Sequence, residues 1–497
     1  MTDTLVRRVG EIAAAQPERE ALIFRSETVT YGQLYSDVRR MGSALRVLGI
    51  KKGDRVLFSA VSKPISAEIL LAVQYVGAIP ILIDKNSTPE NALAVYEDAG
   101  GSLFFTDMKF REKPKSVNIL SLKKAAGMET EAISDYSAPA PEETAEVLFT
   151  TGTTGRPKGV MLSYRAVYSI IQHTLSGIGI RDDERILMPL PLHHSYSLRV
   201  LRAALYSGAC VVLQNGLAFA SEVEKNQREH GCTAITVVPV SMELLRTQMQ
   251  EHFYEIMGRF RYIEVGAGSL TVEQRKRLVK KLPNTRIFNT WGSSETGGAL
   301  FTDVNAAAAD PLHVSAVGRP LPDVEVFVLD ERGVPIQSDA EHTGRLALKG
   351  EMIMSGYWGQ PSLTEAALRD GMLVTNDIVW QDADGYVHML GRADDIINVG
   401  GEKVSPIEVE NIAGEYEPVK ECICIGVPDE KTGLGQIPIL CLAAEASFTE
   451  AGIRTYLAGR MERCKIPVHY MLVEAVPRNR MQKPDRKAVR KLWDERK

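Results

Sequence analysis

An alternation of helical and strand-like segments from about residue 30 to residue 265 constrains the fold of this chain most. In the first helical segment, apolar residues recur three or four positions apart, at Leu34, Val38, Met41, Leu45 and Leu48. A second helical segment covers residues 67–75. Short apolar runs typical of buried strands lie at residues 55–59, 79–83, 186–188, 210–213, 234–238 and 262–265. Helices that alternate with buried strands cross over between parallel neighbours, so the sequence predicts mainly parallel sheets covered by helices on both faces.

The pattern changes after about residue 311, where Gly and Asp turns separate shorter strands. Strand-like runs lie at residues 324–329, 344–349 and 386–390. Within this part, the order Ser362-Leu-Thr-Glu365 matches a capping box and predicts the start of a helix.

A last unit begins after the polar residues Gly391-Arg-Ala-Asp-Asp395, and helices and strands alternate in it up to Lys497. We therefore expect an α/β protein with two domains. Residues 1–391 would form a large N-terminal domain of mainly parallel sheets covered by helices, with a β-rich part over about residues 311–391. Residues 392–497 would form a small α+β C-terminal domain.

Composition excludes several classes of protein. The 497 residues include 58 basic and 63 acidic ones, and the resulting net charge of −5 argues against a protein that binds nucleic acid. The most apolar stretch, residues 65–83, contains Glu68, so it is expected to form core elements and not a membrane span. No signal peptide is expected, and six scattered cysteines favour reduced thiols. These features together predict a cytoplasmic protein.

The most informative segment is Leu148-Phe-Thr-Thr-Gly-Thr-Thr-Gly-Arg-Pro-Lys-Gly159. Glycines let a backbone approach an anion closely, and backbone N–H groups and threonine hydroxyls donate to phosphate oxygens. The segment is not a Walker loop, because Pro157 stands where that motif has glycine. A flexible surface turn is the alternative interpretation. The residues expected to hold a phosphate are Thr150, Thr151, Gly152, Thr153, Thr154, Gly155 and Lys158.

This segment resembles the phosphate-binding loop of the adenylate-forming superfamily, which includes acyl-CoA synthetases, aryl-CoA ligases, luciferases and adenylation domains of peptide synthetases. Further segments match the motifs of that family in order: Thr30-Tyr31, Gly53–Val56, Trp291–Glu295, Gly371–Asp377, Gly391–Glu410 and Pro477–Arg486. The resemblance spans essentially the whole chain and is strongest toward acyl- and aryl-CoA synthetases.

The resemblance implies ATP-dependent activation of a small carboxylic acid as an acyl-adenylate, with Mg²⁺ assisting. Transfer of the acyl group to the thiol of coenzyme A would follow. Two alternatives stay open: transfer to the phosphopantetheine thiol of an acyl carrier protein, and a non-catalytic family member that only binds an acyl group or a nucleotide.

The family's motifs also imply roles for single residues of this sequence. Lys483 would bridge the carboxylate and the α-phosphate, Glu295 would act in catalysis as a Mg²⁺ ligand, and His194 would face the acid. Further residues expected to bind the nucleotide are Gly266, Ala267, Gly268, Trp291, Gly292, Ser293, Ser294, Asp377 and Arg392.

The resemblance further implies that the C-terminal domain is mobile. Asp394 aligns with the hinge about which this domain turns between an adenylating pose and a thioester-forming pose. The residues that would then line the thiol-acceptor side are Gly400, Gly401 and Lys403. Three residues stand where the family has glycine: Ser197, Asn376 and Gln482.

Overall fold

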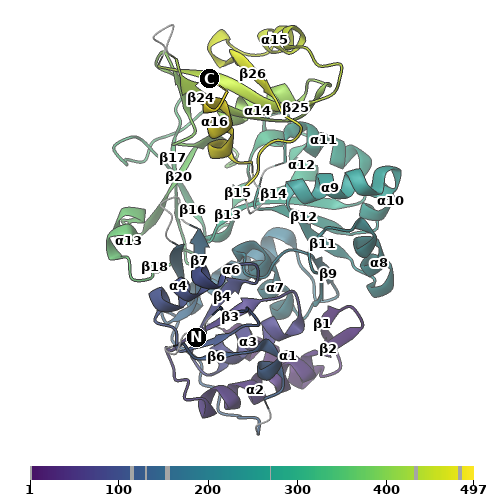
Figure 1. Ribbon diagram of the computed structural model, residues 1–497, viewed down its shortest axis with the longest axis vertical. Helices are drawn as coiled ribbons and strands as arrows, with labels where there is room; N and C mark the ends of the chain where they lie inside the picture. The colour runs from purple at the N-terminus through teal and green to yellow at the C-terminus, as the bar shows by residue number, and fades with distance from the viewer. Residues whose placement is uncertain are drawn as a thin grey trace.

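The computed structural model describes residues 3–111, 117–128, 131–151, 157–268, 270–429, 435–479 and 484–496. Two large, mainly parallel sheets dominate it, and helices lie between them and on their outer faces (Figure 1). The mixed α/β fold predicted from the alternating pattern is therefore confirmed.

The first large sheet has the strand order β18-β8-β7-β4-β3-β5-β6. Its strands are β3 (Arg55–Ala60), β4 (Ile79–Asp84), β5 (Leu103–Phe105), β6 (Ile119–Leu120), β7 (Thr144–Thr151), β8 (Pro157–Ser163) and β18 (Gly356–Tyr357). Strands β3 to β7 run parallel, and β8 and β18 add an antiparallel edge.

The second large sheet has the order β15-β14-β13-β12-β11-β9-β10-β1-β2. Its strands are β1 (Glu20–Phe24), β2 (Glu27–Thr30), β9 (Arg185–Met188), β10 (Cys210–Leu213), β11 (Ala234–Val237), β12 (Tyr262–Gly266), β13 (Arg286–Ser293), β14 (Gly297–Asp303) and β15 (Arg319–Pro320). The six neighbouring strands β13, β12, β11, β9, β10 and β1 run parallel. Antiparallel pairs lie at both edges, with β2 beside β1 at one edge and β14 and β15 beyond β13 at the other.

Helices α3 (Pro64–Tyr75), α6 (Tyr164–Ile178) and α7 (Ser195–Ser207) share one core with strands of both sheets. Helix α3 contacts β1 of one sheet and β3 and β4 of the other, so it lies between them. The outer face of the second sheet is covered by α8 (Ala220–His230), α9 (Pro239–Met249), α10 (Phe253–Met257) and α11 (Val272–Lys281). Helix α4 (Pro89–Ala99) covers the outer face of the first sheet. Helices α1 (Leu5–Ala15) and α2 (Tyr31–Val47) complete the central core.

Helix α7 carries two buried arginines, and each binds a glutamate on a different sheet. Arg202 pairs with Glu146 on β7, and Arg199 pairs with Glu264 on β12. The four side chains are at most 2% exposed. Burial raises the pKa of Glu146 and lowers that of Arg202, while the attraction between the two charges opposes both shifts.

The β-rich part contains β16 (Glu325–Leu329), β17 (Gly344–Lys349), β19 (Leu368–Arg369), β20 (Met372–Gln381) and β21 (Val387–Arg392). These strands pair antiparallel. Two short strands of the same segment belong to the large sheets instead: β18 is an edge strand of the first and β15 of the second.

The predicted capping box is wrong. Helix α13 runs over Pro361–Ala367, so it begins before Ser362, and the side chain of its cap residue Gln360 makes no capping hydrogen bond. Pro361 occupies the first turn, where the φ angle fixed by its ring suits a helix and a missing N–H costs nothing. Thr364 Oγ1 donates to the Gln360 carbonyl at 3.0 Å.

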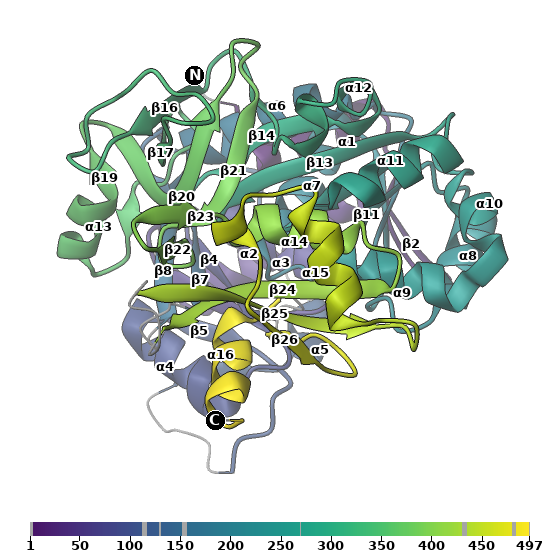
Figure 2. The ribbon, with the colours of Figure 1, turned by 90° about the horizontal axis from the view of Figure 1, so that it is seen from above.

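The last part has two cores of its own. Its elements are β22 (Ile397–Val399), β23 (Glu402–Val404), α14 (Pro406–Gly414), β24 (Val419–Pro428), β25 (Gln436–Ala444), α15 (Glu450–Ala458), β26 (His469–Leu472) and α16 (Arg486–Asp494). They lie at the end of the molecule opposite α2 (Figure 1) and over the large sheets when seen from above (Figure 2). Helix α14 contacts β21.

Two expectations from composition are also met. All six cysteines are free. In the part of the chain that the structure describes, no helix combines the length and the apolar character needed to span a membrane.

The buried pair Arg202–Glu146 generates a stability prediction. We expect Arg202→Met to lower the free energy of unfolding by about 3–5 kcal/mol, because Glu146 is left buried without a cation. The double variant Arg202→Met/Glu146→Leu should recover most of this loss, since an apolar pair avoids desolvation of charge. Urea unfolding followed by tryptophan fluorescence measures both.

The exposed pair Arg7–Glu11, in which Arg7 Nε lies 3.1 Å from Glu11 Oε1, provides the control. Arg7→Met should cost less than about 1 kcal/mol, because water screens this pair. A loss below about 1 kcal/mol for Arg202→Met, or a double variant as unstable as the single one, would contradict the assignment.

Candidate functional site

The predicted phosphate loop connects β7 to β8. Thr150 and Lys158 are partners across these antiparallel strands, and Thr150 Oγ1 donates to the Lys158 carbonyl at 3.5 Å. β7 ends at Thr151. The other residues predicted here, Gly152, Thr153, Thr154 and Gly155, lie outside the described residues, so their role stays a prediction.

Tyr357 connects Lys158 to Glu295. Its strand β18 pairs with β8, its hydroxyl donates to Glu295 Oε1 at 2.9 Å, and Lys158 Nζ lies 5.6 Å from its ring centroid. Burial raises the pKa of the Tyr357 hydroxyl and the Glu295 carboxylate raises it further, so this hydroxyl remains a hydrogen-bond donor. Sequence reasoning missed Tyr357, because nothing in its local spacing indicates that it lies beside Glu295.

Trp291, Gly292, Ser293 and Ser294 lead into a tight turn between β13 and β14. Ser293 Oγ accepts from the Glu295 backbone N–H at 3.2 Å, which holds the turn closed. A Cβ on Gly292 would lie 1.6 Å from the Gly297 carbonyl oxygen, so only glycine fits there. The half-buried Trp291 packs against the central core.

The acid motif and the predicted adenine turn are in contact. His194 is the N-cap residue of α7, and Ser294 Oγ donates to Ser195 Oγ at 3.3 Å. The next residue, Tyr196, packs its ring against Gly266, where a Cβ would lie 2.6 Å away, and its hydroxyl donates to the Glu264 carbonyl at 3.0 Å.

Beyond Gly266 the chain turns sharply. Ala267 has a φ of 58°, in the left-handed region, and a Cβ on Gly268 would lie 3.2 Å from the ring of Pro239. Asn289 donates to the carbonyls of Val265 and Gly268 at 2.8 and 3.1 Å, which fixes the turn.

A second histidine accompanies the predicted one. The rings of His193 and His194 have centroids 4.0 Å apart, and His193 Nδ1 lies 3.8 Å from Asp84 Oδ1. Burial lowers the pKa of His193, which Asp84 partly offsets. The pair therefore connects the start of α7 to the end of β4.

The residues present suit a Mg²⁺ ion that arrives with ATP. No three His, Cys, Asp or Glu side chains gather into a metal site among the described residues. As an oxygen donor, the Glu295 carboxylate would suit Mg²⁺, and phosphate oxygens and water would complete the coordination that this ion prefers.

Asp377 and Arg392 face each other across β20 and β21. Thr375 Oγ1 accepts from the Asp377 backbone N–H at 3.1 Å. The neighbouring Asn376 donates from its side-chain Nδ2 to Asp394 Oδ2 at 2.7 Å. The predicted ribose ligands and the predicted hinge residue therefore occupy one sheet edge.

The predicted thiol-acceptor residues form the turn of the hairpin β22–β23. Gly400 and Gly401 have φ angles of 61° and 100°, values that favour glycine, and Asn398 Oδ1 accepts from the Gly401 N–H at 2.9 Å. Lys403 Nζ donates to Glu331 Oε1 at 3.0 Å in the β-rich part, so it does not contact the Lys158–Tyr357–Glu295 group.

Lys483 and Gln482 lie outside the described residues. The chain on either side of them is held together: Arg478 and Pro484 form a bridge, and the Asp485 N–H donates to the Pro477 carbonyl at 2.9 Å. The catalytic role of Lys483 stays a prediction.

The contact between Tyr357 and Glu295 can be tested through metal dependence. We expect Tyr357→Phe to raise the Mg²⁺ concentration needed for half-maximal ATP binding about tenfold, because Glu295, the predicted Mg²⁺ ligand, loses the donor that orients it. Calorimetric ATP titrations at several Mg²⁺ concentrations measure this. Tyr386→Phe, the same change in the β20–β21 hairpin, is the control, and an unchanged Mg²⁺ dependence in Tyr357→Phe would refute the positioning role.

Comparison with known proteins supports the grouping of these motifs. The family described as AMP-binding enzyme matches residues 9–358, and the AMP-binding enzyme C-terminal domain matches residues 408–483. The chain is 26% identical over 495 residues to 2-succinylbenzoate–CoA ligase of Bacillus cereus, covering 99% of this chain and 100% of that protein. It is 28% identical over 479 residues to the enzyme of the same name from Bacillus subtilis, covering 95% and 94%.

Solved structures have the same fold. The o-succinylbenzoate CoA synthetase of Bacillus subtilis, in complex with the acyl-adenylate intermediate, matches with a TM-score of 0.84 and 26% identity over 97% of each chain. ATP-bound MatB from Rhodopseudomonas palustris matches in fold with a TM-score of 0.88 and 23% identity, covering 100% of this chain and 99% of that one. Both the ordered motifs and the family match over residues 9–358 place this chain in the family of AMP-binding enzymes.

Proposed function

We propose that the protein is an ATP-dependent, AMP-forming ligase that joins a carboxylic acid to coenzyme A. The observation that carries this proposal is the contact between the predicted phosphate-binding residues and the predicted acid motif. Lys158, Tyr357 and Glu295 form a charged group on one side, and the Ser294–Ser195 hydrogen bond joins the Glu295 turn to the start of α7. A nucleotide phosphate and an acid would therefore lie side by side.

In the first step two anions, the carboxylate and ATP, must come together, and the site offers positive charge to both. A carboxylate oxygen attacks the α-phosphorus of ATP, the bond from that phosphorus to the bridging oxygen breaks, and pyrophosphate leaves. Lys158 offsets phosphate charge, and Lys483 bridges the carboxylate and the α-phosphate as negative charge accumulates. Glu295 would hold Mg²⁺, whose charge would offset that of the phosphate oxygens.

In the second step a thiolate attacks the acyl carbon and AMP leaves with the electron pair of the broken C–O bond. No cysteine of the chain is required as a nucleophile. The C-terminal domain, residues 392–497, turns about Asp394 and brings Gly400, Gly401 and Lys403 to the acyl-adenylate while Lys483 withdraws.

Coenzyme A is the favoured acceptor, because the relatives found by sequence are named CoA ligases. A carrier-protein phosphopantetheine thiol has the same chemistry and is the competing acceptor. A non-catalytic role is disfavoured, since a protein that only binds a nucleotide has no need of a lysine at position 483.

The proposal predicts acid-dependent exchange of pyrophosphate into ATP. 2-Succinylbenzoate, which the named relatives activate, is the first acid to test, followed by a panel of aliphatic and aromatic acids. Addition of coenzyme A should then release AMP and form the acyl thioester, whereas a phosphopantetheine-bearing carrier protein should be a poor acceptor. No exchange with any acid would refute the proposal.

Lys483→Ala is the control that separates the two steps. It should abolish exchange but leave thioester formation from a supplied acyl-adenylate within about threefold of the parent, because the lysine acts only while the phosphate bond breaks. Equal loss of both steps would refute this single-step role.

The Asn376–Asp394 hydrogen bond gives a prediction for the turning of the domain. Asn376→Gly restores the family's residue and removes a bond of about 1 kcal/mol to the hinge. In this structure Lys403 binds Glu331 and does not contact the Lys158–Tyr357–Glu295 group, so the domain is not in the thioester-forming pose. We expect the thioester step to accelerate about fivefold, since this pose loses that stabilisation, and exchange to change less than twofold. Single-turnover measurements of each step provide the test. Asn376→Asp should accelerate the thioester step further, because the new carboxylate repels that of Asp394. An unchanged thioester rate in both variants would exclude this contact as a brake.

A further inference from the structure

A cavity of about 170 Å³ lies beside the acid motif, where the carboxyl ends of both large sheets meet. Its polar and charged lining residues are Arg25, Ser62, Lys63, Lys85 and Asn215. Arg25 follows β1, Ser62 and Lys63 follow β3, Lys85 follows β4, and Asn215 follows β10. The crevice outside the carboxyl ends of parallel strands is where α/β proteins bind their ligands.

The charges around this cavity are all positive. In the described part of the chain no carboxylate lines it, although the chain as a whole has a net charge of −5. Asp84, the neighbour of Lys85, accepts from the Asn86 N–H at 2.9 Å, lies 3.8 Å from His193 and is not among the residues that line the cavity.

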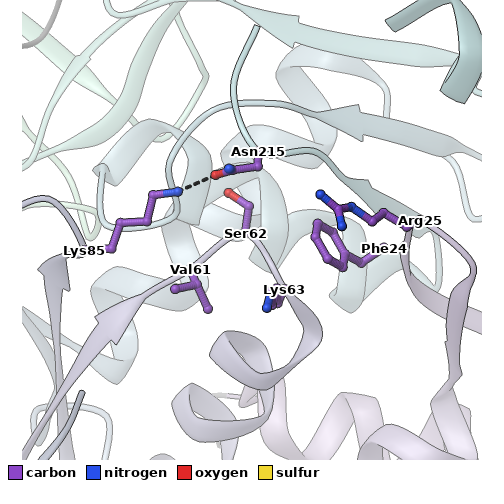
Figure 3. Close-up of a pocket in the computed structure, with 7 residues that line it drawn as sticks. All are labelled: Phe24, Arg25, Val61, Ser62, Lys63, Lys85 and Asn215. Carbon is purple, nitrogen blue, oxygen red and sulfur yellow. Dashed lines mark hydrogen bonds between the residues drawn. The ribbon is translucent and has the colours of Figure 1, made fainter. Parts of the chain in front are cut away.

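Among the described residues, no ion pair is found for Arg25, Lys63 or Lys85. Arg25 and Lys63 both lie over the ring of Phe24, at 5.3 and 5.9 Å from its centroid. Lys85 donates to the neutral side-chain oxygen of Asn215. Figure 3 shows Arg25, Ser62 and Lys85 reaching toward the same space from different loops.

The backbone at Arg25 supports a functional reason for this arrangement. Its φ of 57° lies in the left-handed region, where a hairpin turn ordinarily has Asn or Gly. Residues held in sparsely populated backbone conformations cluster at functional sites, so this conformation makes Arg25 a candidate ligand residue.

We propose that this cavity binds a dianionic phosphate group. Three cations, the Ser62 hydroxyl and the Asn215 amide offer more donors and more charge than one carboxylate requires, and they match the two charges and three oxygens of a phosphate monoester. The cavity is smaller than the roughly 300 Å³ of pockets that enclose whole ligands, so it takes the phosphate and not an entire nucleotide.

This cavity lies next to the proposed active site. The Gly216 N–H donates to the Pro189 carbonyl at 3.1 Å, so the loop after β10 packs on the segment that leads to His193 and His194. Lys85 is close enough to His193 to lower the pKa of that histidine, in addition to the lowering by burial.

Two sources of the phosphate share this chemistry. One is the 3′-phosphate of coenzyme A, and this source rests on the proposed function. The other is free inorganic phosphate, which requires no catalytic activity. The two can be separated by experiment, because dephospho-coenzyme A lacks only that 3′-phosphate.

The first experiment measures inorganic phosphate binding by the full-length protein as a rise in melting temperature at constant ionic strength. We expect the rise to persist in Lys158→Gln, which removes charge from the predicted ATP site. In that Lys158→Gln background it should vanish when Arg25→Asn/Lys63→Gln is added, where Asn suits the left-handed turn. Lys123→Gln/Lys124→Gln removes the same charge from exposed positions of α5 (Leu122–Ala126) and should keep the rise. An equal rise in the pocket variant would overturn the proposal.

The second experiment identifies the source. If coenzyme A supplies the phosphate, the pocket variant raises the KM for coenzyme A about tenfold and leaves the KM for dephospho-coenzyme A and the pyrophosphate exchange rate unchanged. If both KM values stay unchanged while the melting-temperature response is lost, free phosphate is the ligand. A parent protein without exchange activity refutes the proposed function alone, because the phosphate titration still tests the pocket.

Discussion

Two buried ion pairs on α7 hold the two large sheets in a defined relation. Arg202 binds Glu146 on one sheet, and Arg199 binds Glu264 on the other. A buried charge that loses its partner costs several kcal/mol, so the helix cannot slide or rotate without breaking a pair. Because α7 begins beside His194 and β12 ends at Gly266, the same pairs orient the predicted acid motif against the predicted adenine turn. Core packing and site geometry therefore depend on one set of contacts.

Cationic side chains lie over aromatic ring faces at two places near the candidate functional site. Lys158 lies over Tyr357, and Arg25 and Lys63 lie over Phe24. A ring face attracts a cation without neutralising it, so the charge stays available for an anionic ligand. A carboxylate in the same place would hold the cation equally well but would compete with phosphate. This difference explains how a chain with a net negative charge presents positive sites to several anions.

The sequence predicted the parallel strands well, because short apolar runs bounded by turns leave little choice of element. It failed at Ser362, where the proline before it suits the first helical turn and shifts the start of the helix. It also singled out Asn376 as a departure from the family's pattern without indicating its partner. The hydrogen bond to Asp394 depends on how the strand ending at Arg392 continues into the next unit.

The sequence by itself determined the family, the order of the motifs and the residue types predicted to bind phosphate, because these features lie within short segments. Only the tertiary structure decided which segments meet. Tyr357 and Glu295 are 62 positions apart, and Arg202 and Glu146 are 56 positions apart. The cavity of Arg25, Lys63 and Lys85 draws on loops from both sheets. Local propensity acts over a few residues, whereas contacts such as these follow from how whole sheets and helices pack.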